Sequence, residues 1–313
     1  MVHDRCVCGE GEGFVVAQVD RYGLALDTVL CDVCGTLRFD PSLSQDALAD
    51  FYASFYQEMY ARVADPDRYF RREQSYGRRL LAFARGVWER GACVVEVGCG
   101  AGGALAVFQE AGYRVFGCDY SEPLLQLGRQ RGVQNLHLGG IEALAEHFPC
   151  NGAADLIFLH HVLEHLSAPL NVLETAKRML SDRGMIVVAV PDVTGIDRFR
   201  FPSGNLRLFL HVAHKYNFTS KGLRVLAERA GLRASAVPVE PSMEAPELWA
   251  GFAPRPVEIG PEMAEWPVDG EALFRQLRRI EGRFIGRTLL GRLSGPLRRR
   301  ADPVAARDAN DGQ

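Results

Sequence analysis

A glycine-rich turn between two apolar runs constrains the fold of this chain more than any other feature. It reads Ala-Cys-Val-Val-Glu-Val-Gly-Cys-Gly-Ala-Gly-Gly over residues 92–103. Residues 92–97 resemble a short buried strand, 104–111 have helical character, and 113–118 form a second apolar run that ends at Asp119. The order of strand, glycine turn, helix, strand and acid predicts half of a nucleotide-binding α/β sheet.

The turn and Asp119 indicate how such a sheet would hold its ligand. Glycines let the backbone approach a ligand closely and leave the next helix N-terminus open to it. Asp119 follows Gly98 by 21 residues, where a carboxylate can accept hydrogen bonds from both ribose hydroxyls. Gly98, Gly100 and Gly103 also satisfy G-x-G-x-x-G, so a dinucleotide remains an alternative at this point. Glu96 favours another ligand, because a carboxylate there suits a cationic amino-acid group better than a pyrophosphate.

A later segment carries a family resemblance. Residues 154–169 read Ala-Asp-Leu-Ile-Phe-Leu-His-His-Val-Leu-Glu-His-Leu-Ser-Ala-Pro. Together with E-V-G-C-G-A-G and G-C-D, in this order, this segment resembles the class I S-adenosylmethionine-dependent methyltransferases over about residues 91–235. The resemblance implies an α/β fold with a Rossmann-like doubly wound sheet, and S-adenosylmethionine as the cofactor.

The resemblance also implies a cofactor site. The glycine turn would hold the methionine part, Asp119 the ribose, and the loop at 140–142 the adenine, while the backbone of His160 would lie beside the sulfonium. Ile141 departs from the family, many members of which have an acidic residue at this position. The residues so assigned are Glu96, Gly98, Cys99, Gly100, Gly102, Asp119, Tyr120, Ile141, Glu142 and His160.

Methylation of a hydroxyl requires a group that removes its proton, and histidine is the default base near neutral pH. The candidates are His161, His165, His214 and Tyr216. His161 and His165 are four residues apart and share a face if the segment is helical, and Glu164 could orient a base. The alternative is that these histidines serve helix packing and loop hydrogen bonding.

Four cysteines near the N-terminus form two knuckles, C-V-C-G and C-D-V-C-G, at Cys6, Cys8, Cys31 and Cys34. The sequence between them predicts two short strands joined at Tyr22-Gly23, so residues 1–40 are expected to form a zinc ribbon with structural zinc. The first knuckle is one residue shorter than usual, which leaves His3 as an alternative ligand.

Residues 41–90 are predicted to form a helical lid with tyrosines at 52, 56, 60, 69 and 76. Ribbon, lid and a core over 91–237 resemble bacterial methyltransferases of nucleotide-sugar, capsule and lipopolysaccharide pathways. We therefore expect O-methylation of a sugar or glycan, either nucleotide- or lipid-linked. The chain is shorter than the deoxysugar C-methyltransferases, which carry a large extra C-terminal domain; C-methylation and small-molecule methylation remain alternatives.

Charge distribution bears on whether the chain is an RNA methyltransferase. Residues 1–40 hold three arginines against seven carboxylates, whereas RNA binding needs a basic surface, so no nucleic-acid partner is expected. The intact glycine turn and Asp119 argue against a non-catalytic scaffold. No apolar run reaches the ~18 residues of a membrane span, and the N-terminus lacks a signal peptide's apolar core, so we expect a cytoplasmic protein.

The C-terminal third divides into two expected parts. Seven prolines between 238 and 267 predict a Pro-rich arm over 238–270. Residues 271–313 form a basic tail, in which 271–300 carry nine arginines against two glutamates. Its amphipathic pattern is compatible with peripheral contact with an anionic membrane at the inner face, or with a helix packed on the protein. The final dozen residues are expected to be disordered.

Overall fold

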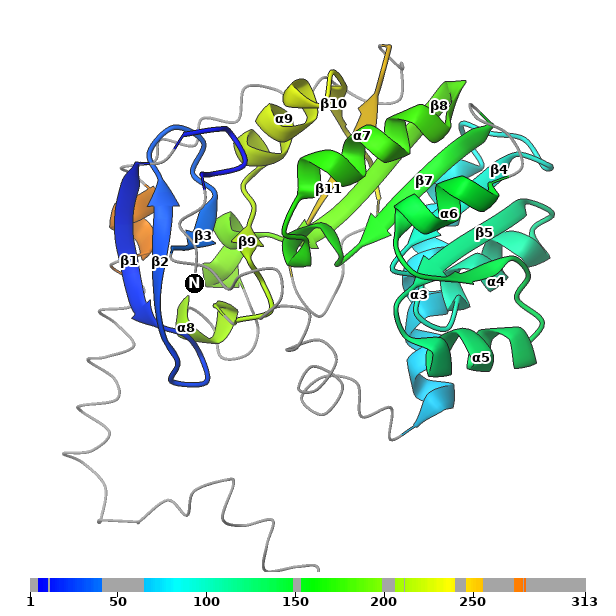
Figure 1. Cartoon of the computed structure of the whole chain (residues 1–313), viewed down its shortest axis with the longest axis horizontal. Coiled ribbons are helices and arrows are strands. Elements are labelled where there is room, and N and C mark those ends of the chain that lie inside the picture. Colours follow the sequence, from blue (N-terminus) through cyan, green and yellow to red (C-terminus); the bar gives the residue numbers. More distant parts are fainter. Residues whose placement is uncertain are drawn as a thin grey trace, which may run out of the picture.

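The computed structural model contains a large sheet covered by helices and a small sheet beside it (Figure 1). It describes residues 5–10, 12–40, 65–148, 153–198, 206–210, 212–239, 246–255, 273–277 and 279.

The large sheet has seven strands in the order β10-β11-β8-β7-β4-β5-β6. Strands β4 to β8 are parallel to their neighbours, whereas β11 is antiparallel to both β8 and β10. The chain moves outward one way from β4 to β6 and the other way from β7 to β8, so the switch point lies between β4 and β7, where ligands bind in such sheets. The strands are β4 (Cys93–Val97), β5 (Arg114–Asp119), β6 (Leu136–Leu138), β7 (Ala154–His160), β8 (Leu180–Pro191), β10 (Arg233–Ala236) and β11 (Glu247–Ala253).

Helices cover both faces of this sheet, which confirms the predicted doubly wound α/β class. Along β4 the side chains alternate between two apolar clusters, with Val95 in one and Val94 in the other. The first cluster contains residues of α6 (Ile141–His147), α7 (Pro169–Met179) and α9 (Ser220–Arg229). The second contains residues of α3 (Pro66–Ala84), α4 (Gly103–Glu110) and α5 (Glu122–Gln130). Shorter helices are η2 (Leu163–His165), η3 (Val193–Arg198) and α8 (Leu206–Phe209).

The Pro-rich segment differs from its prediction. Instead of an arm over 238–270, residues 247–253 form β11 inside the sheet, with Glu247 opposite Pro191 and Phe252 opposite Ile186. Pro246 and Pro254 flank this strand without interrupting it, so every residue within it keeps a backbone N–H for the ladder. The core therefore extends beyond residue 237.

The small sheet has the order β1-β2-β3-β9 and is antiparallel throughout. Its strands are β1 (Gly13–Val19), β2 (Ala25–Cys31), β3 (Leu37–Phe39) and β9 (Tyr216–Asn217). The predicted pair of strands joined at Tyr22-Gly23 is confirmed by β1 and β2. The fourth strand, β9, lies about 180 residues after β3 in the chain and directly before α9. A segment from within the expected core of residues 91–237 therefore completes the small sheet, which the sequence did not indicate.

The helix over residues 273–277 packs on the small sheet. Leu273 and Leu277 are buried in one apolar cluster with Val16 and Leu30. The ring of Phe274 lies 5.2 Å from that of Phe14. The described start of the basic tail thus contacts protein, while 281–313 lie outside the described residues. Within the described part of the chain, no helix is both long and apolar enough to cross a membrane.

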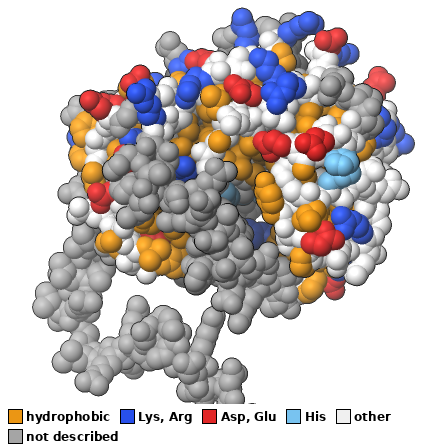
Figure 2. Space-filling model, in the orientation of Figure 1, with side chains coloured by type: hydrophobic (Ala, Val, Ile, Leu, Met, Phe, Trp, Pro, Cys, Tyr) orange, Lys and Arg blue, Asp and Glu red, His pale blue; other side chains and the backbone are white. Residues whose placement is uncertain are grey.

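Charged side chains of both signs are mixed on the face in Figure 2, and basic ones gather along its upper edge.

Helix α3 is the described part of the predicted lid; residues 41–64, with the tyrosines at 52, 56 and 60, lie outside the described residues. The helix begins after Asp65, whose side chain accepts a hydrogen bond from the Arg68 backbone, and Pro66 occupies its first turn. It packs directly on α4, because a Cβ at Gly77 would lie only 2.6 Å from Ala104 Cα.

This contact predicts an unusual response to a mild substitution. Gly77→Ala should destabilise the fold by about 1–3 kcal/mol through overpacking, although alanine normally stabilises a helix relative to glycine. Gly86→Ala is the matched control, because its Cβ would come no closer than 3.4 Å to Phe83 O. Denaturant unfolding measures both. Equal stability of the two variants would contradict the tight α3–α4 contact.

Candidate functional site

The glycine turn lies between the carboxyl ends of β4 and β5 and leads into α4. Gly98, Gly100 and Gly102 have φ values of 70°, 55° and 72°, in the left-handed region that favours glycine. Asp119 links the glycine turn to the segment between β5 and α5. Its Oδ2 accepts a hydrogen bond from Gly100 N at 2.9 Å, and its Oδ1 accepts one from Ser121 N at 2.8 Å. Burial raises the pKa of Asp119.

Helix α3 places a carboxylate on this turn. Glu73, 5% exposed, accepts from Ala101 N at 3.1 Å and from Gly103 N at 2.8 Å. A Cβ at Gly100 would lie 2.2 Å from Glu73 Oε1, so only glycine allows this approach. Burial raises the pKa of Glu73 to about 8.

Glu96 and Tyr76 form a buried pair at the end of β4. The Tyr76 hydroxyl donates to Glu96 Oε1 at 2.7 Å, whereas Glu96 Oε2 is buried without a hydrogen-bond partner. Burial, with a further contribution from Glu73, raises the pKa of Glu96 well above its ordinary value. A carboxylate oxygen without a partner is costly in the interior, so Glu96 Oε2 is suited to receive a donor from a ligand.

His160 ends β7 and His161 follows it, and both side chains lie beside Glu247 at the start of β11. Glu247 Oε1 lies 3.1 Å from His161 Nε2 and 3.3 Å from His160 Nε2. Its other oxygen, Oε2, accepts from Arg79 Nη1 at 3.0 Å and Trp249 Nε1 at 3.1 Å. The ring of His160 stacks on that of Tyr76, with centroids 3.8 Å apart.

The two histidines differ in charge. Burial lowers the pKa of His160 to about 4, which keeps it neutral. Burial also opposes the charged form of His161, but hydrogen bonds to Glu164 and Glu247 outweigh it and raise its pKa to about 9. His161 Nδ1 lies 3.2 Å from Glu164 Oε1, and the residue has a φ of 55°, which is uncommon for a non-glycine residue and marks local strain.

Two of the other candidate bases, His165 and His214, lie within 4.8 Å of Glu164, the carboxylate that also contacts His161. His165 is in η2, and its Nδ1 lies 2.8 Å from Ala213 O. His214 stands next to it, with ring centroids 4.7 Å apart. Tyr216 is in β9, is 4% exposed and packs beside Phe218. The structure therefore groups His165 with His214 and sets Tyr216 in the small sheet.

The residues assigned to the adenine side converge near Gly140. A Cβ at Gly140 would lie 2.6 Å from Tyr120 Oη and 3.0 Å from Glu142 Oε2. Tyr120 is 80% exposed, whereas Ile141 and Cys99 are buried and face the core. An exposed ring and a carboxylate thus flank the loop at the end of β6.

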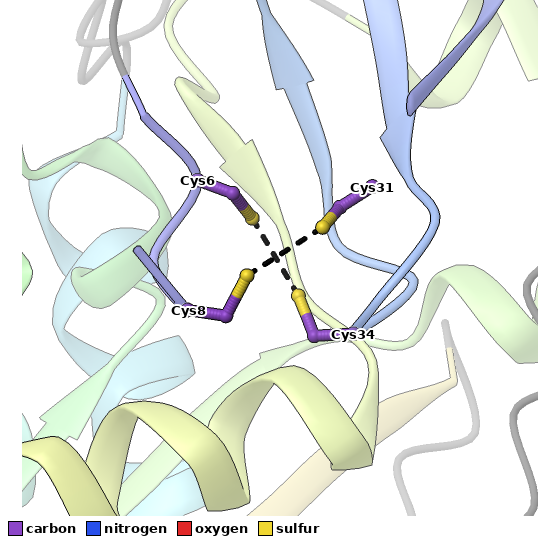
Figure 3. Close-up of side chains that lie close together, drawn as sticks. All are labelled: Cys6, Cys8, Cys31 and Cys34. Carbon is purple, nitrogen blue, oxygen red and sulfur yellow. Dashed lines mark hydrogen bonds between the residues drawn. The ribbon is translucent and has the colours of Figure 1, made fainter. Parts of the chain in front are cut away.

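The four N-terminal cysteines converge (Figure 3). The sulfurs of Cys6 and Cys34 lie 3.5 Å apart, as do those of Cys8 and Cys31. All four sulfurs lie within 4.8 Å of one another. Tetrahedral Zn²⁺ with bonds of ~2.3 Å would separate its sulfur ligands by about 3.8 Å, so this donor set fits the ion. The short first knuckle does not prevent it; His3 lies outside the described residues.

The small sheet is tied to the core beside these cysteines. Thr219 caps α9 by accepting from Gly222 N at 3.0 Å, and its hydroxyl donates to Cys34 O at 2.7 Å. Arg229 Nη1, at the other end of α9, donates to Val7 O. Both knuckles therefore contact α9.

Four further residues at the site carry no recognisable motif in the sequence: Glu73, Arg79, Glu247 and Trp249. The spacing of Tyr69, Glu73, Tyr76 and Arg79, three or four residues apart, is the signal that could have placed a polar face of α3 over the site. Glu247 and Trp249 have no such signal, because the prolines around them predict an arm.

Residues 68–237 match the sequence model of a family described as methyltransferase domain. The C-methyltransferase NovU of Streptomyces niveus is 28% identical over 144 residues, which are 46% of this chain and 33% of that protein. The ubiquinone biosynthesis O-methyltransferase of Haemophilus ducreyi is 29% identical over 103 residues, 31% of this chain and 44% of that protein. The matches thus span less than half of these curated relatives.

Solved methyltransferase structures also resemble the chain. The 1,6-didemethyltoxoflavin-N1-methyltransferase of Burkholderia thailandensis, with S-adenosylhomocysteine bound, is 19% identical and covers 72% of this chain and 94% of its own, with a TM-score of 0.46. A SAM-dependent methyltransferase of Archaeoglobus fulgidus is 15% identical and covers 65% and 99%, with a TM-score of 0.45.

The family match covers more than half of the chain and contains β4 to β8, the glycine turn and Asp119. The protein therefore belongs to the methyltransferase domain family, over residues 68–237.

Proposed function

We propose that the protein methylates a hydroxyl of a sugar or glycan, either nucleotide- or lipid-linked, in nucleotide-sugar, capsule or lipopolysaccharide biosynthesis. The observation that carries the O-methylation is the imidazole of His161, held between Glu164 and Glu247 at the carboxyl end of β7. A polar site with a basic group suits a hydroxyl acceptor, whose proton has to leave as the methyl group arrives.

The cofactor is assigned to the switch point of the sheet. S-adenosylmethionine supplies a methyl group already activated on a sulfonium, so the protein has to bind it, align the acceptor and exclude water. Glu96 and the turn of Gly98, Cys99, Gly100 and Gly102 would hold the methionine part. Asp119 would hold the ribose, Tyr120, Ile141 and Glu142 the adenine side, and His160 the region near the sulfonium. The unpartnered Glu96 Oε2 supports this assignment, because it could accept a hydrogen bond from the methionine ammonium.

Substitution of Asp119 tests the ribose assignment. Asp119→Ala should weaken S-adenosylmethionine binding at least tenfold, because two hydrogen bonds to a charged acceptor are lost. Glu122→Gln, which removes an exposed carboxylate paired with Arg129, is the control. Calorimetric titration measures both. Unchanged affinity in folded Asp119→Ala would contradict the assignment.

Base catalysis is assigned to His161. His161 would take the proton of the acceptor hydroxyl as its oxygen receives the methyl group. S-adenosylmethionine, when bound, would supply that methyl group and depart as a neutral thioether. His165, His214 and Tyr216 are weaker candidates, since His165 Nδ1 lies against a carbonyl and Tyr216 is buried in the small sheet. Glu164 and Glu247 orient the imidazole and stabilise its charged form after it takes the proton.

The pH dependence follows from these contacts. A base acts when deprotonated, and the pKa of His161 is raised to about 9, so turnover should rise with pH and level off above about 9. Glu247→Gln or Glu164→Gln removes an anionic neighbour and should move this limb to lower pH. NMR titration of the histidine imidazoles measures the pKa of His161 in the wild type and in both variants, without an acceptor. The signal that disappears in His161→Asn belongs to His161, and His147→Asn is the control, which should leave that signal in place.

A His161 titration near 6.5 that neither variant moves would contradict the proposal. If turnover is instead lost on EDTA treatment and restored by Mg²⁺ or Mn²⁺, metal activation of the acceptor oxygen replaces base catalysis.

Structural zinc is assigned to the cysteine quartet of Cys6, Cys8, Cys31 and Cys34. Four thiolates leave no open coordination position, so the ion would stabilise the ribbon without taking part in catalysis. The convergence of the four sulfurs supports this assignment.

Removal of one ligand tests the metal site. Cys31→Ser should lower zinc content from about one ion per chain to a small fraction and lower Tm by about 5–10 °C. Cys93→Ser is the matched control, because Cys93 is buried in β4 and should keep the zinc whatever it costs in stability. Elemental analysis and thermal unfolding measure the two effects. Zinc retained in Cys31→Ser would argue against the quartet.

The acceptor class is tested by product analysis. The enzyme is incubated with nucleotide sugars, lipid-linked glycans and small phenols, together with ¹³C-methyl S-adenosylmethionine. The carbon shift of the product separates an ether methyl from a C-methyl group. A C-methyl product, which the match to NovU favours, would replace the O-methylation proposal.

A further inference from the structure

Glu73 occupies a position that the methyltransferase chemistry does not require. Its two oxygens accept from Ala101 N and Gly103 N, at the end of the cofactor turn and the start of α4. The Tyr69 hydroxyl is a further hydrogen-bond partner from the same helix. A permanently neutral acceptor could make these contacts as well, so the presence of an ionisable carboxyl at this position calls for a separate explanation.

Three carboxylates surround this one turn. Glu73 reaches Ala101, Asp119 reaches Gly100, and Glu96 lies two residues before Gly98. Glu73 and Glu96 are 5% and 0% exposed. Among the residues that the structure describes, no lysine or arginine forms an ion pair with any of the three carboxylates. Glu96 Oε2 is buried without a hydrogen-bond partner, so a donor group of a bound ligand could pair with it.

The other titratable groups around Glu73 stay neutral near neutral pH. Burial raises the pKa of Tyr76 and of Cys99 well above their ordinary values, and burial lowers that of His160, stacked on Tyr76, to about 4. The remaining neighbour, Tyr69, is a hydroxyl donor to Glu73. Changes of charge at the turn therefore belong to Glu73, Glu96 and Asp119.

We propose that Glu73 makes the cofactor turn selective for charge: cationic S-adenosylmethionine binds with release of a proton, whereas S-adenosylhomocysteine, whose sulfur is neutral, binds with less release and lower affinity. This inference rests on the proposed cofactor site and assigns to Glu73 the exchange of product for fresh cofactor. Both ligands carry the same ammonium and carboxylate, so the sulfonium is the difference that the cluster can sense.

The sign of the linkage follows from the free protein. Burial raises the pKa of Glu73 to about 8, so its carboxyl is largely protonated at neutral pH. A bound cation favours the ionised form, so the proton leaves on binding. Affinity for S-adenosylmethionine should then increase with pH and level off above about 8, and affinity for S-adenosylhomocysteine should change less.

Calorimetry of the full chain tests this with both ligands, in buffers of different ionisation enthalpy, over about pH 6.5–9. The wild type should release more protons to the buffer when it binds S-adenosylmethionine than when it binds S-adenosylhomocysteine. Glu73→Gln should remove most of this difference and reduce the ratio of the two Kd values about tenfold. Glu122→Gln is the matched control and should leave both unchanged. Glu73→Asp keeps the charge and should keep the extra proton release.

Each outcome has one meaning. If the wild type binds neither ligand, the proposed cofactor site fails. If it binds both with equal proton release, the charge-selective role of Glu73 fails while the cofactor site stands. If Glu73→Gln and Glu73→Asp weaken both ligands equally and leave the difference in proton release intact, Glu73 only supports the turn, and the proposal is overturned.

Discussion

The close approach of α3 to the glycine turn is the contact on which the rest of the site depends. Gly77 and Gly103 remove the side chains that would hold the helix away, and Glu73 fills the space that a Cβ at Gly100 would take. Once the helix is seated, its polar face reaches Glu96 through Tyr76 and Glu247 through Arg79. One helix thus connects the ends of β4, β7 and β11.

Strand β11 completes the site from the other side. It runs antiparallel beside β8, so its first residue, Glu247, lies at the carboxyl edge of the parallel strands instead of the opposite edge. This direction lets one carboxylate meet His160, His161 and Arg79 together. A parallel strand at the same place would begin at the far edge, where Glu247 could contact none of them.

Sequence patterns predicted the parts of the molecule that depend on local chemistry. The glycine turn and the hairpin around Tyr22-Gly23 are short patterns in which residue type dictates backbone shape. The contacts of Glu73 and Glu247 are long-range, and nothing near them in sequence indicates their partners. The number of prolines between 238 and 267 led to the prediction of an arm where the structure has β11. Prolines that flank a strand raise this number as much as prolines that would break it.

The small sheet has a consequence for how the chain is made. Its fourth strand, β9, lies about 180 residues after Leu37 and Arg38, the residues with which it pairs. The N-terminal hairpin therefore leaves the ribosome long before its last strand exists, and the edge of β3, fully buried in the finished protein, stays open meanwhile. The hairpin is thus synthesised well before its sheet can be completed, and during that interval one edge of it stays unpaired.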